Sequence, residues 1–540
     1  MSVANQIMWN RLIAVVEEQA LTLVRTAFSP SVREAGDVSA GVFDVEGRMI
    51  AQAVTGTPGH VNAMAAAVKN FIDAIGESNI RDGDVYFTND PWLGTGHLLD
   101  FSFCTPSFRN GKLVGYFACT AHVVDVGGRG FNPDSNDVYE EGIYIPITHF
   151  AHEGVVDEKL LHIISYNIRE PDMVIGDLHG LAACNEIGHR RLMEMMDEFG
   201  IDSLADLAAF VFDASHRATI DALKDLPKGK YASSMTVDGY NEPVTIAVEL
   251  EVKPDGVHAD LSGTSPVSPR GINVPMIYTE AYVCYGLKCV LAPEIPNNHA
   301  SLAPFTTYAP PGCILNAQHP APVATRHVLG HFIPDTVMGA VAQFLPETAP
   351  AEGSGALWAI MLSARPEEGG QAAPGETLRR AEMLVFTSGG AGARPGLDGL
   401  NATAFPSGVM GMSMEALEQT GPITVWRKEL REGSGGAGRQ RGGLGQVIEI
   451  AANDGHAFWF NGMFDRVNHA ARGRAGGQNG APGRVSLSDG TLLSGKGRQF
   501  VPAGKRLVLE LPGGGGFGPS DSRDADLIRQ DRDRGYDSNA

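Results

Sequence analysis

A β-hairpin predicted over residues 101–121 constrains the fold of this chain more than any other segment. Two strand-like runs, FSFCTPSF and KLVGYFACTA, stand on either side of Arg-Asn-Gly. Asn-Gly is the strongest short-range hairpin signal, because both residues tolerate a positive φ. The two strands therefore pair antiparallel, and the residues that precede the first strand meet those that follow the second.

Each side of this open end carries a histidine followed three residues later by an aspartate. His97 and Asp100 come before the first strand, and His122 and Asp125 come after the second. Because the strands pair antiparallel, all four side chains are expected in one neighbourhood. Glycines at positions 94, 96, 127 and 128 would let the chain bend inward there.

The hairpin loop decides which of these residues face each other. A two-residue Asn110-Gly111 loop would place Leu99 opposite His122, whereas a loop that also includes Lys112 would place Asp100 opposite His122. Because strand side chains alternate between faces, only the second register puts Asp100 and His122 on one face.

This residue set predicts a metal site. Imidazole and carboxylate together suit manganese, zinc or iron, and two histidines with one aspartate leave positions open for catalysis. The alternative is structural, with each aspartate holding a buried histidine in one tautomer. A single His-x-x-Asp favours that structural interpretation, but two copies joined by a hairpin favour the metal.

The whole chain is predicted to be a multidomain α+β protein. Its 540 residues exceed a usual domain several times, and 43% hydrophobic content can fill a large core. Helical periodicity dominates the first part, while alternating strands and glycine-rich connections dominate the C-terminal part. The expected units are an N-terminal metal-site domain (1–228), a middle α+β domain (229–376), a β-rich domain (377–520) and a charged flexible tail (521–540).

Composition excludes several classes of function. A net charge of −21, from 63 acidic and 42 basic residues, would repel nucleic acid and anionic membranes. The apolar runs are too short to span a membrane, and Glu17 and Glu18 interrupt what a signal peptide would need, so a cytoplasmic protein is expected. The six cysteines form no C-x-x-C pair and are expected to be reduced, mostly buried thiols.

Other motifs are weaker candidates. His327 and His331 could share a helix face and a metal, together with His319 nearby, but core or surface histidines are the favoured interpretation. PGGGGFG at 512–518 lacks the Lys-Ser/Thr ending of a phosphate loop and is expected to be a tight turn. GSGGAGRQRGGLGQ opens no helix and is interpreted as a loop that lets backbone approach a partner chain. The sequence thus offers a metal site but no ATP site.

The chain resembles the hydantoinase B/oxoprolinase family over nearly its whole length. That family includes the beta subunits of ATP-dependent N-methylhydantoinase and caprolactamase, one part of 5-oxoprolinase and the alpha subunit of acetone carboxylase. The blocks that carry the resemblance stand in the family's order: GTPGHVNAM, GDVYFTNDP, GHLLD, AHVVDVGG, NIREPDMVIGDL, DLSGTSP, GGAGARPGLDG, GGAGRQRGGLGQV and PGGGGFG. One departure is Gly94-Thr95-Gly96 before His97, where the family usually has Gly-Gly-Thr.

The resemblance implies ligands and a partner. The metal positions of the carboxylase relative match His97, Asp100 and His122, with Asp125 as a candidate fourth ligand or as the residue that orients His122. A separate ATP-binding, hydantoinase A-like subunit with ATP and Mg would phosphorylate the substrate, in a hetero-oligomer such as α2β2. Glu141 or Asp90 is expected to carry a proton, because each is near the site in sequence.

The implied function is the beta subunit of an ATP-dependent hydrolase of a hydantoin, 5-oxoproline or another lactam. Two alternatives stay open: the metal-bearing subunit of a ketone carboxylase, and a non-catalytic scaffold for the ATPase subunit. Carboxylase versions of this subunit tend to be longer, so 540 residues favour the hydrolase.

Overall fold

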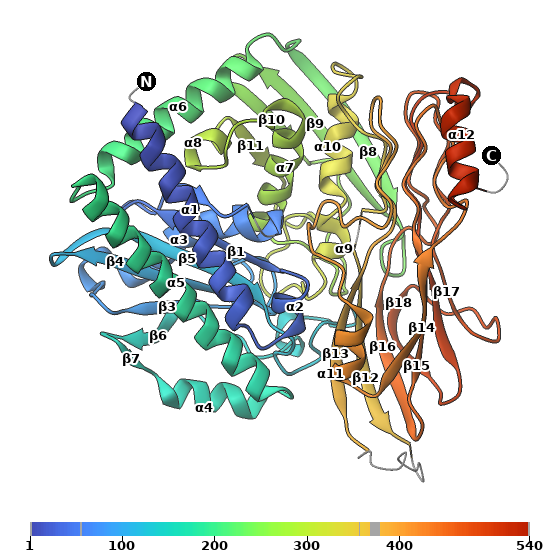
Figure 1. The fold of residues 1–540 in the computed structure, drawn as a ribbon, viewed down its shortest axis with the longest axis horizontal. Helices are drawn as coiled ribbons and strands as arrows, with labels where there is room; N and C mark the ends of the chain where they lie inside the picture. Colours follow the sequence, from blue (N-terminus) through green and yellow to red (C-terminus); the bar gives the residue numbers. More distant parts are fainter. Residues whose placement is uncertain (1–2, 55–56, 356, 368–377, 538–540) are drawn as a thin grey trace.

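A computed structural model describes residues 3–54, 57–355, 357–367 and 378–537. It confirms a mixed fold of helices and several sheets, in which long helices pack around the N-terminal sheet and the C-terminal part consists mainly of strands (Figure 1). In the described ranges no helix combines the length and apolar character that a membrane crossing demands.

A seven-stranded sheet organises the N-terminal part, in the order β2-β1-β5-β4-β3-β6-β7. Its strands are β1 (Val38–Phe43), β2 (Met49–Gln52), β3 (Val85–Thr88), β4 (Asp100–Arg109), β5 (Lys112–His122), β6 (Thr148–His152) and β7 (Val155–Val156). The helices around it are α1 (Val3–Thr26), α2 (Pro30–Arg33), α3 (Pro58–Ile75), α4 (Glu158–Asn167), α5 (Pro171–Phe199) and α6 (Ala205–Leu223), with short 3-10 turns η1 (Glu77–Asn79) and η2 (Val138–Glu140).

Helices cover both faces of this sheet. On β5, Phe117 packs with the buried residues of α1 and α5, whereas Tyr116 and Ala118 pack with those of α3. Successive strand residues point to opposite faces, so α3 lies on the side away from α1 and α5. Figure 1 shows α1 and α5 side by side across the sheet.

The predicted hairpin forms as β4 and β5, and Asp100 lies opposite His122. The loop is the two-residue Asn110-Gly111 turn, with φ of 51° and 72°. The register comes instead from a bulge: Phe108 pairs with Leu113 and Ser107 with Gly115, so Val114 is an extra residue. Of the two loops that the sequence left open, the two-residue one forms, yet the bulge gives the Asp100–His122 pairing that was expected of the longer one.

The middle part is a four-stranded sheet, in the order β11-β10-β9-β8, covered by helices. The expected hairpin around Pro-Asp-Gly is confirmed, with Lys253 paired to Gly256. The elements are β8 (Gly229–Val237), β9 (Val244–Lys253), β10 (Gly256–Asp260), α7 (Met276–Leu291), α8 (His299–Leu302), β11 (Phe305–Tyr308), α9 (His327–Gly330) and α10 (Ile333–Val341). Helix α7 packs on α3, which joins this part to the N-terminal sheet.

Two four-stranded sheets form the C-terminal part, ordered β13-β12-β16-β18 and β14-β15-β19-β17. Leu362 and Phe460 of the first share one core with Ile448 and Leu509 of the second. The elements are β12 (Trp358–Pro366), β13 (Ala381–Thr387), α11 (Met414–Thr420), β14 (Ile423–Leu430), β15 (Gln446–Ala452), β16 (His456–Met463), β17 (Arg484–Leu487), β18 (Lys496–Val501), β19 (Arg506–Glu510), η3 (Ser520–Ser522) and α12 (Ala525–Asp533).

The glycine-rich segments pack against one another. Gly443 N donates to Ala391 O at 2.8 Å and Gly443 O accepts from Gly514 N at 2.9 Å, and Gly436 N donates to Gly514 O at 2.9 Å. A Cβ on Gly443 would lie 2.0 Å from Leu400 O. The close backbone approach predicted for a partner chain thus occurs within the chain, and residues 512–518 are part of this packing and form no isolated turn.

The predicted domain limits can be compared with the bounds of the strands and helices. Strand β8 begins at Gly229, next to the predicted limit at 228. The limit at 376 lies outside the described residues, and β12 and β13 on either side of it pair in one sheet. Within the tail expected to be flexible, α12 forms and its Asp531 is 5% exposed, bound by Arg441 and Arg523.

Candidate metal centre

The predicted site lies around a small cavity of about 30 Å³, where all three parts of the chain meet. The hairpin contributes His97 and His122, α3 contributes His60, and α9 with its C-terminal neighbour contributes His327 and His331. Leu357, Ala359 and Phe386 of the C-terminal part line it as well. A space of this size can hold a bound ion and a water molecule.

The side chains of His97 and Asp100 are in direct contact. His97 Nδ1 lies 2.8 Å from the carbonyl oxygen of Ala324, and His97 Nε2 lies 2.8 Å from Asp100 Oδ1. A carbonyl oxygen can only accept, so Nδ1 carries a proton. If the ring is neutral, Nε2 carries no proton, and its lone pair faces a carboxylate oxygen that is also an acceptor. A cation held by both atoms would remove the repulsion between them.

The environment favours a neutral His97 and an ionised Asp100. Burial, followed by the nearby Arg326 guanidinium, lowers the pKa of His97. Burial alone would raise the pKa of Asp100, but Arg326, His60 and His97 hold it well below its usual range. Asp100 Oδ2 accepts from Arg326 Nη2, from Thr95 Oγ1 at 2.9 Å and from His60 Nε2 at 2.9 Å.

The altered turn before His97 has a structural use here. Gly96 has a φ of 102°, and a Cβ on it would lie 2.5 Å from Cδ of Arg326. The missing side chain therefore leaves room for Arg326 to reach Asp100, while Thr95 donates to the same carboxylate.

Two further histidines present free nitrogens to the cavity. Both ring nitrogens of His122 and both of His327 are buried without a hydrogen-bond partner within the described residues. Burial lowers the pKa of His122 to about 4 and that of His327 well below its usual range, so both rings are neutral donors of a lone pair. His97, Asp100 and His122 have potential ligand atoms within 4.8 Å of one another, a donor set that could hold a metal ion.

The other predicted residues take different places. Asp125 is buried, but its oxygens accept from Arg169 Nη1 at 2.6 Å, from Arg169 N and from Gly127 N at 3.1 Å. No hydrogen bond joins Asp125 to His122, whose ring nitrogens have no partner in the described chain. The orienting role predicted for Asp125 is therefore absent from the structure.

The two predicted proton carriers line no part of the cavity. Glu141 Oε1 accepts from Val323 N at 2.7 Å and from Ala324 N at 2.8 Å, so it fixes the segment whose carbonyl holds His97. Burial raises the pKa of Glu141 well above its usual range. Asp90 accepts from Trp92 N at 2.8 Å within its own turn and from the distant Tyr144 Oη at 2.7 Å.

The sequence interpretation missed Asp37, His60 and Arg326. Asp37 Oδ1 accepts from Thr57 Oγ1 at 2.5 Å and lies 3.5 Å from His60 Nδ1, which continues the network outward from Asp100. His327 and His331 are buried core histidines, as favoured, but they also line this cavity. His319 does not line it. An arginine inside the apolar run PVATRHVLGHF was the one available signal for Arg326.

The chain belongs to the hydantoinase B/oxoprolinase family, whose model matches residues 1–520. A protein of Pseudomonas sp. (strain NS671), named as the B component of a D-/L-hydantoinase, is 28% identical over 97% of this chain and 91% of its own. The crystal structure of the ATP-dependent caprolactamase from Pseudomonas jessenii matches with a TM-score of 0.87 at 26% identity, covering 99% of this chain and 94% of that one.

The nucleotide-free structure of acetone carboxylase shares the fold, with a TM-score of 0.84 at 17% identity over 99% of this chain and 78% of that chain. The proteins that this chain is similar to therefore include an ATP-dependent caprolactamase and, in fold, an acetone carboxylase.

Proposed function

We propose that this chain is the metal-bearing beta component of an ATP-dependent cyclic-amide hydrolase, acting on a hydantoin, 5-oxoproline or another lactam. The observation that carries the proposal is the 2.8 Å contact of His97 Nε2 with Asp100 Oδ1, beside the unpartnered nitrogens of His122. A divalent metal, manganese, zinc or iron, fits this donor set.

The residues around the metal position have separate tasks. A bound divalent ion would polarise the amide carbonyl or lower the pKa of an attacking water. Ala324 O holds the tautomer of His97 that presents Nε2 inward. Arg326, Thr95 and His60 occupy Asp100 Oδ2, which leaves Oδ1 for His97 Nε2. His327 offers a further nitrogen to the same space.

Activation of the substrate belongs to a partner. An unactivated amide is a poor electrophile, and the chain has no phosphate-binding loop of the Walker type. We therefore assign ATP and Mg to a hydantoinase A-like subunit, in a hetero-oligomer such as α2β2. Relatives that are named as single subunits of a hydantoinase and a caprolactamase support such a partner.

A ketone carboxylase is the second candidate, and the shared fold with acetone carboxylase is the observation that favours it. In a carboxylase, a metal held by the same residues would act on a different electrophile. A scaffold without a metal is the third candidate, and it offers no reason for unpartnered buried histidines.

The test is to co-express the chain with its hydantoinase A-like partner and measure ATP turnover with hydantoin, 5-oxoproline and caprolactam. Turnover should require both subunits and a lactam, should fall by at least about a hundredfold in His122→Ala, and should persist in His216→Gln, an exposed control on α6. Lactam-dependent turnover by the isolated chain would contradict the two-subunit mechanism. Turnover that needs bicarbonate and a ketone would replace the hydrolase with the carboxylase.

A further inference from the structure

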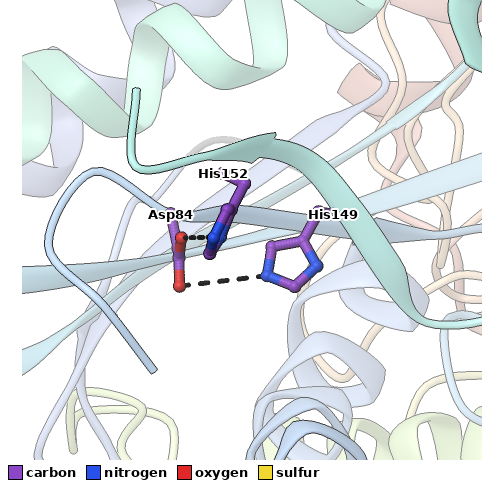
Figure 2. A group of neighbouring side chains, drawn as sticks. All are labelled: Asp84, His149 and His152. Atoms are coloured by element: carbon purple, nitrogen blue, oxygen red, sulfur yellow. Dashed lines mark hydrogen bonds and ion pairs between the residues drawn. The ribbon is translucent and has the colours of Figure 1, made fainter. Parts of the chain in front are cut away.

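Asp84, His149 and His152 gather beside β3 and β6 of the seven-stranded sheet (Figure 2), and none of them lines the cavity of His97. His152 Nδ1 lies 2.9 Å from Asp84 Oδ1, and His149 Nε2 lies 3.9 Å from Asp84 Oδ2. The three ligand atoms all lie within 4.8 Å of one another. Two imidazoles and one carboxylate are the same donor types as in the buried centre.

A bulge in β6 brings the two histidines to one face. Tyr86 pairs with His149 and Val85 with Ala151, so Phe150 is an extra residue in β6. In a regular strand, residues three apart would point to opposite faces. The inserted residue changes this alternation, and His149 and His152 then both face Asp84.

The backbone and Tyr86 hold the carboxylate of Asp84 in place. Arg81 N donates to Asp84 Oδ2 at 2.8 Å, Tyr86 Oη donates to it at 2.6 Å, and Glu153 N donates to Oδ1 at 3.0 Å. Burial by itself would raise the pKa of Asp84, but these donors lower it below its usual value. The ligand is thus rigid, buried and ionised.

The histidines, in contrast, are open to solvent. Their side chains are 37% and 60% exposed, although the nitrogen His149 Nε2 is itself buried. His149 Nε2 has no hydrogen-bond partner in the described chain. His149 also packs on the ring of Tyr86, with centroids 4.9 Å apart, which limits its movement.

We propose that Asp84, His149 and His152 form a second metal site, for zinc or another divalent transition metal, that clamps β6 to the turn before β3. With bonds of about 2.0–2.2 Å in a tetrahedral site, neighbouring ligand atoms lie about 3.3 Å apart. The observed 2.9 and 3.9 Å stand on either side of that value. Two nitrogens favour a transition metal over magnesium or calcium.

Titration of the full chain with Zn²⁺, or with Co²⁺ followed by its visible absorption, tests the proposal. Wild type should bind one equivalent more than His149→Gln or His152→Gln, and Zn²⁺ should raise its Tm by an increment that these variants lack. Either substitution should weaken the site by at least about tenfold.

Two controls separate this site from the buried centre and from general loss of histidine. His216→Gln, exposed on α6, should bind as much metal as wild type does. His122→Ala should keep the metal ion bound by Asp84, His149 and His152 and lose the ion of the buried centre. Far-UV circular dichroism checks that the variants fold. Equal stoichiometry and affinity in wild type, His149→Gln and His152→Gln would overturn the proposal.

Discussion

His97, Asp100 and His122 present the chemistry of the centre, and their replacement should show it directly. His97→Ala and His122→Ala should each lower metal affinity by at least about a hundredfold, because each removes a ligand nitrogen. Asp125→Asn should change it by less than about tenfold, because Asp125 binds Arg169 and makes no hydrogen bond to His122. Elemental analysis of the purified variants is the measurement, and equal loss in Asp125→Asn would make Asp125 a ligand.

Glu141 is expected to position the site and not to carry a proton. Glu141→Gln keeps an acceptor for Val323 N and Ala324 N, so activity and stability should remain close to wild type. Glu141→Ala leaves two buried N–H groups unsatisfied, at about 1–3 kcal/mol each. Denaturant unfolding and ATP turnover of both variants provide the comparison. A hundredfold slower reaction in a stably folded Glu141→Gln would restore the proton-carrying role.

Asp335 on α10 predicts a pH effect that is separate from the metal. Burial and the neighbouring Glu352 raise its pKa from 3.8 to about 7. Between those values the folded state binds more protons than the unfolded state, so this group makes stability fall as pH rises. Asp335→Asn removes that dependence, and its Tm relative to wild type should increase from pH 5 to pH 8. A constant difference across this range would show that Asp335 does not titrate there.

At the scale of elements, the hairpin shows which features of the fold can be predicted from the sequence. Asn110-Gly111 and two alternating runs predict β4 and β5, because a hairpin turn is a local property. The Asp100–His122 register depends on the bulge at Val114, which no local signal marks. A Cβ on Gly115 would lie 2.4 Å from Phe43 O, so β1 also shapes this part of the strand.

The rest of the centre depends on contacts between distant segments. Arg326 and Asp100 are separated by 226 residues, and the helix that carries His60 meets them only through tertiary packing. Spacing along one sequence cannot reveal such a pairing. The same limit applies to Asp125 and Glu141, whose partners Arg169 and Ala324 lie in segments that the motifs do not include.

The packed glycine segments should be intolerant of any side chain. In Gly443→Ala the new methyl group would lie 2.0 Å from Leu400 O, a backbone atom that cannot move alone. We expect a loss of about 3 kcal/mol or an insoluble product. Gly411→Ala is the matched control, because its nearest atom is Lys428 Nζ at 4.0 Å. Equal thermal stability of the two variants would contradict the account of this packing.

At the scale of the whole molecule, the cavity joins all three parts of the chain. The hairpin and α3 supply ligands and their partners, α9 supplies His327, and the C-terminal sheet supplies the apolar cover. A cleft of about 850 Å³ between α3 and α7 includes none of His97, Asp100 or His122. The proposed site is therefore chosen for its donor chemistry and not for the size of its cavity.

The central proposal is that His97 Nε2, Asp100 Oδ1 and a nitrogen of His122 would hold a divalent cation. The most direct measurement is anomalous diffraction at the manganese, iron and zinc edges, from crystals of protein purified without chelator. The account predicts a peak within about 2.0–2.2 Å of both atoms and of a nitrogen of His122. A map without a peak in this cavity, with His97 Nε2 and Asp100 Oδ1 still 2.8 Å apart, would contradict it.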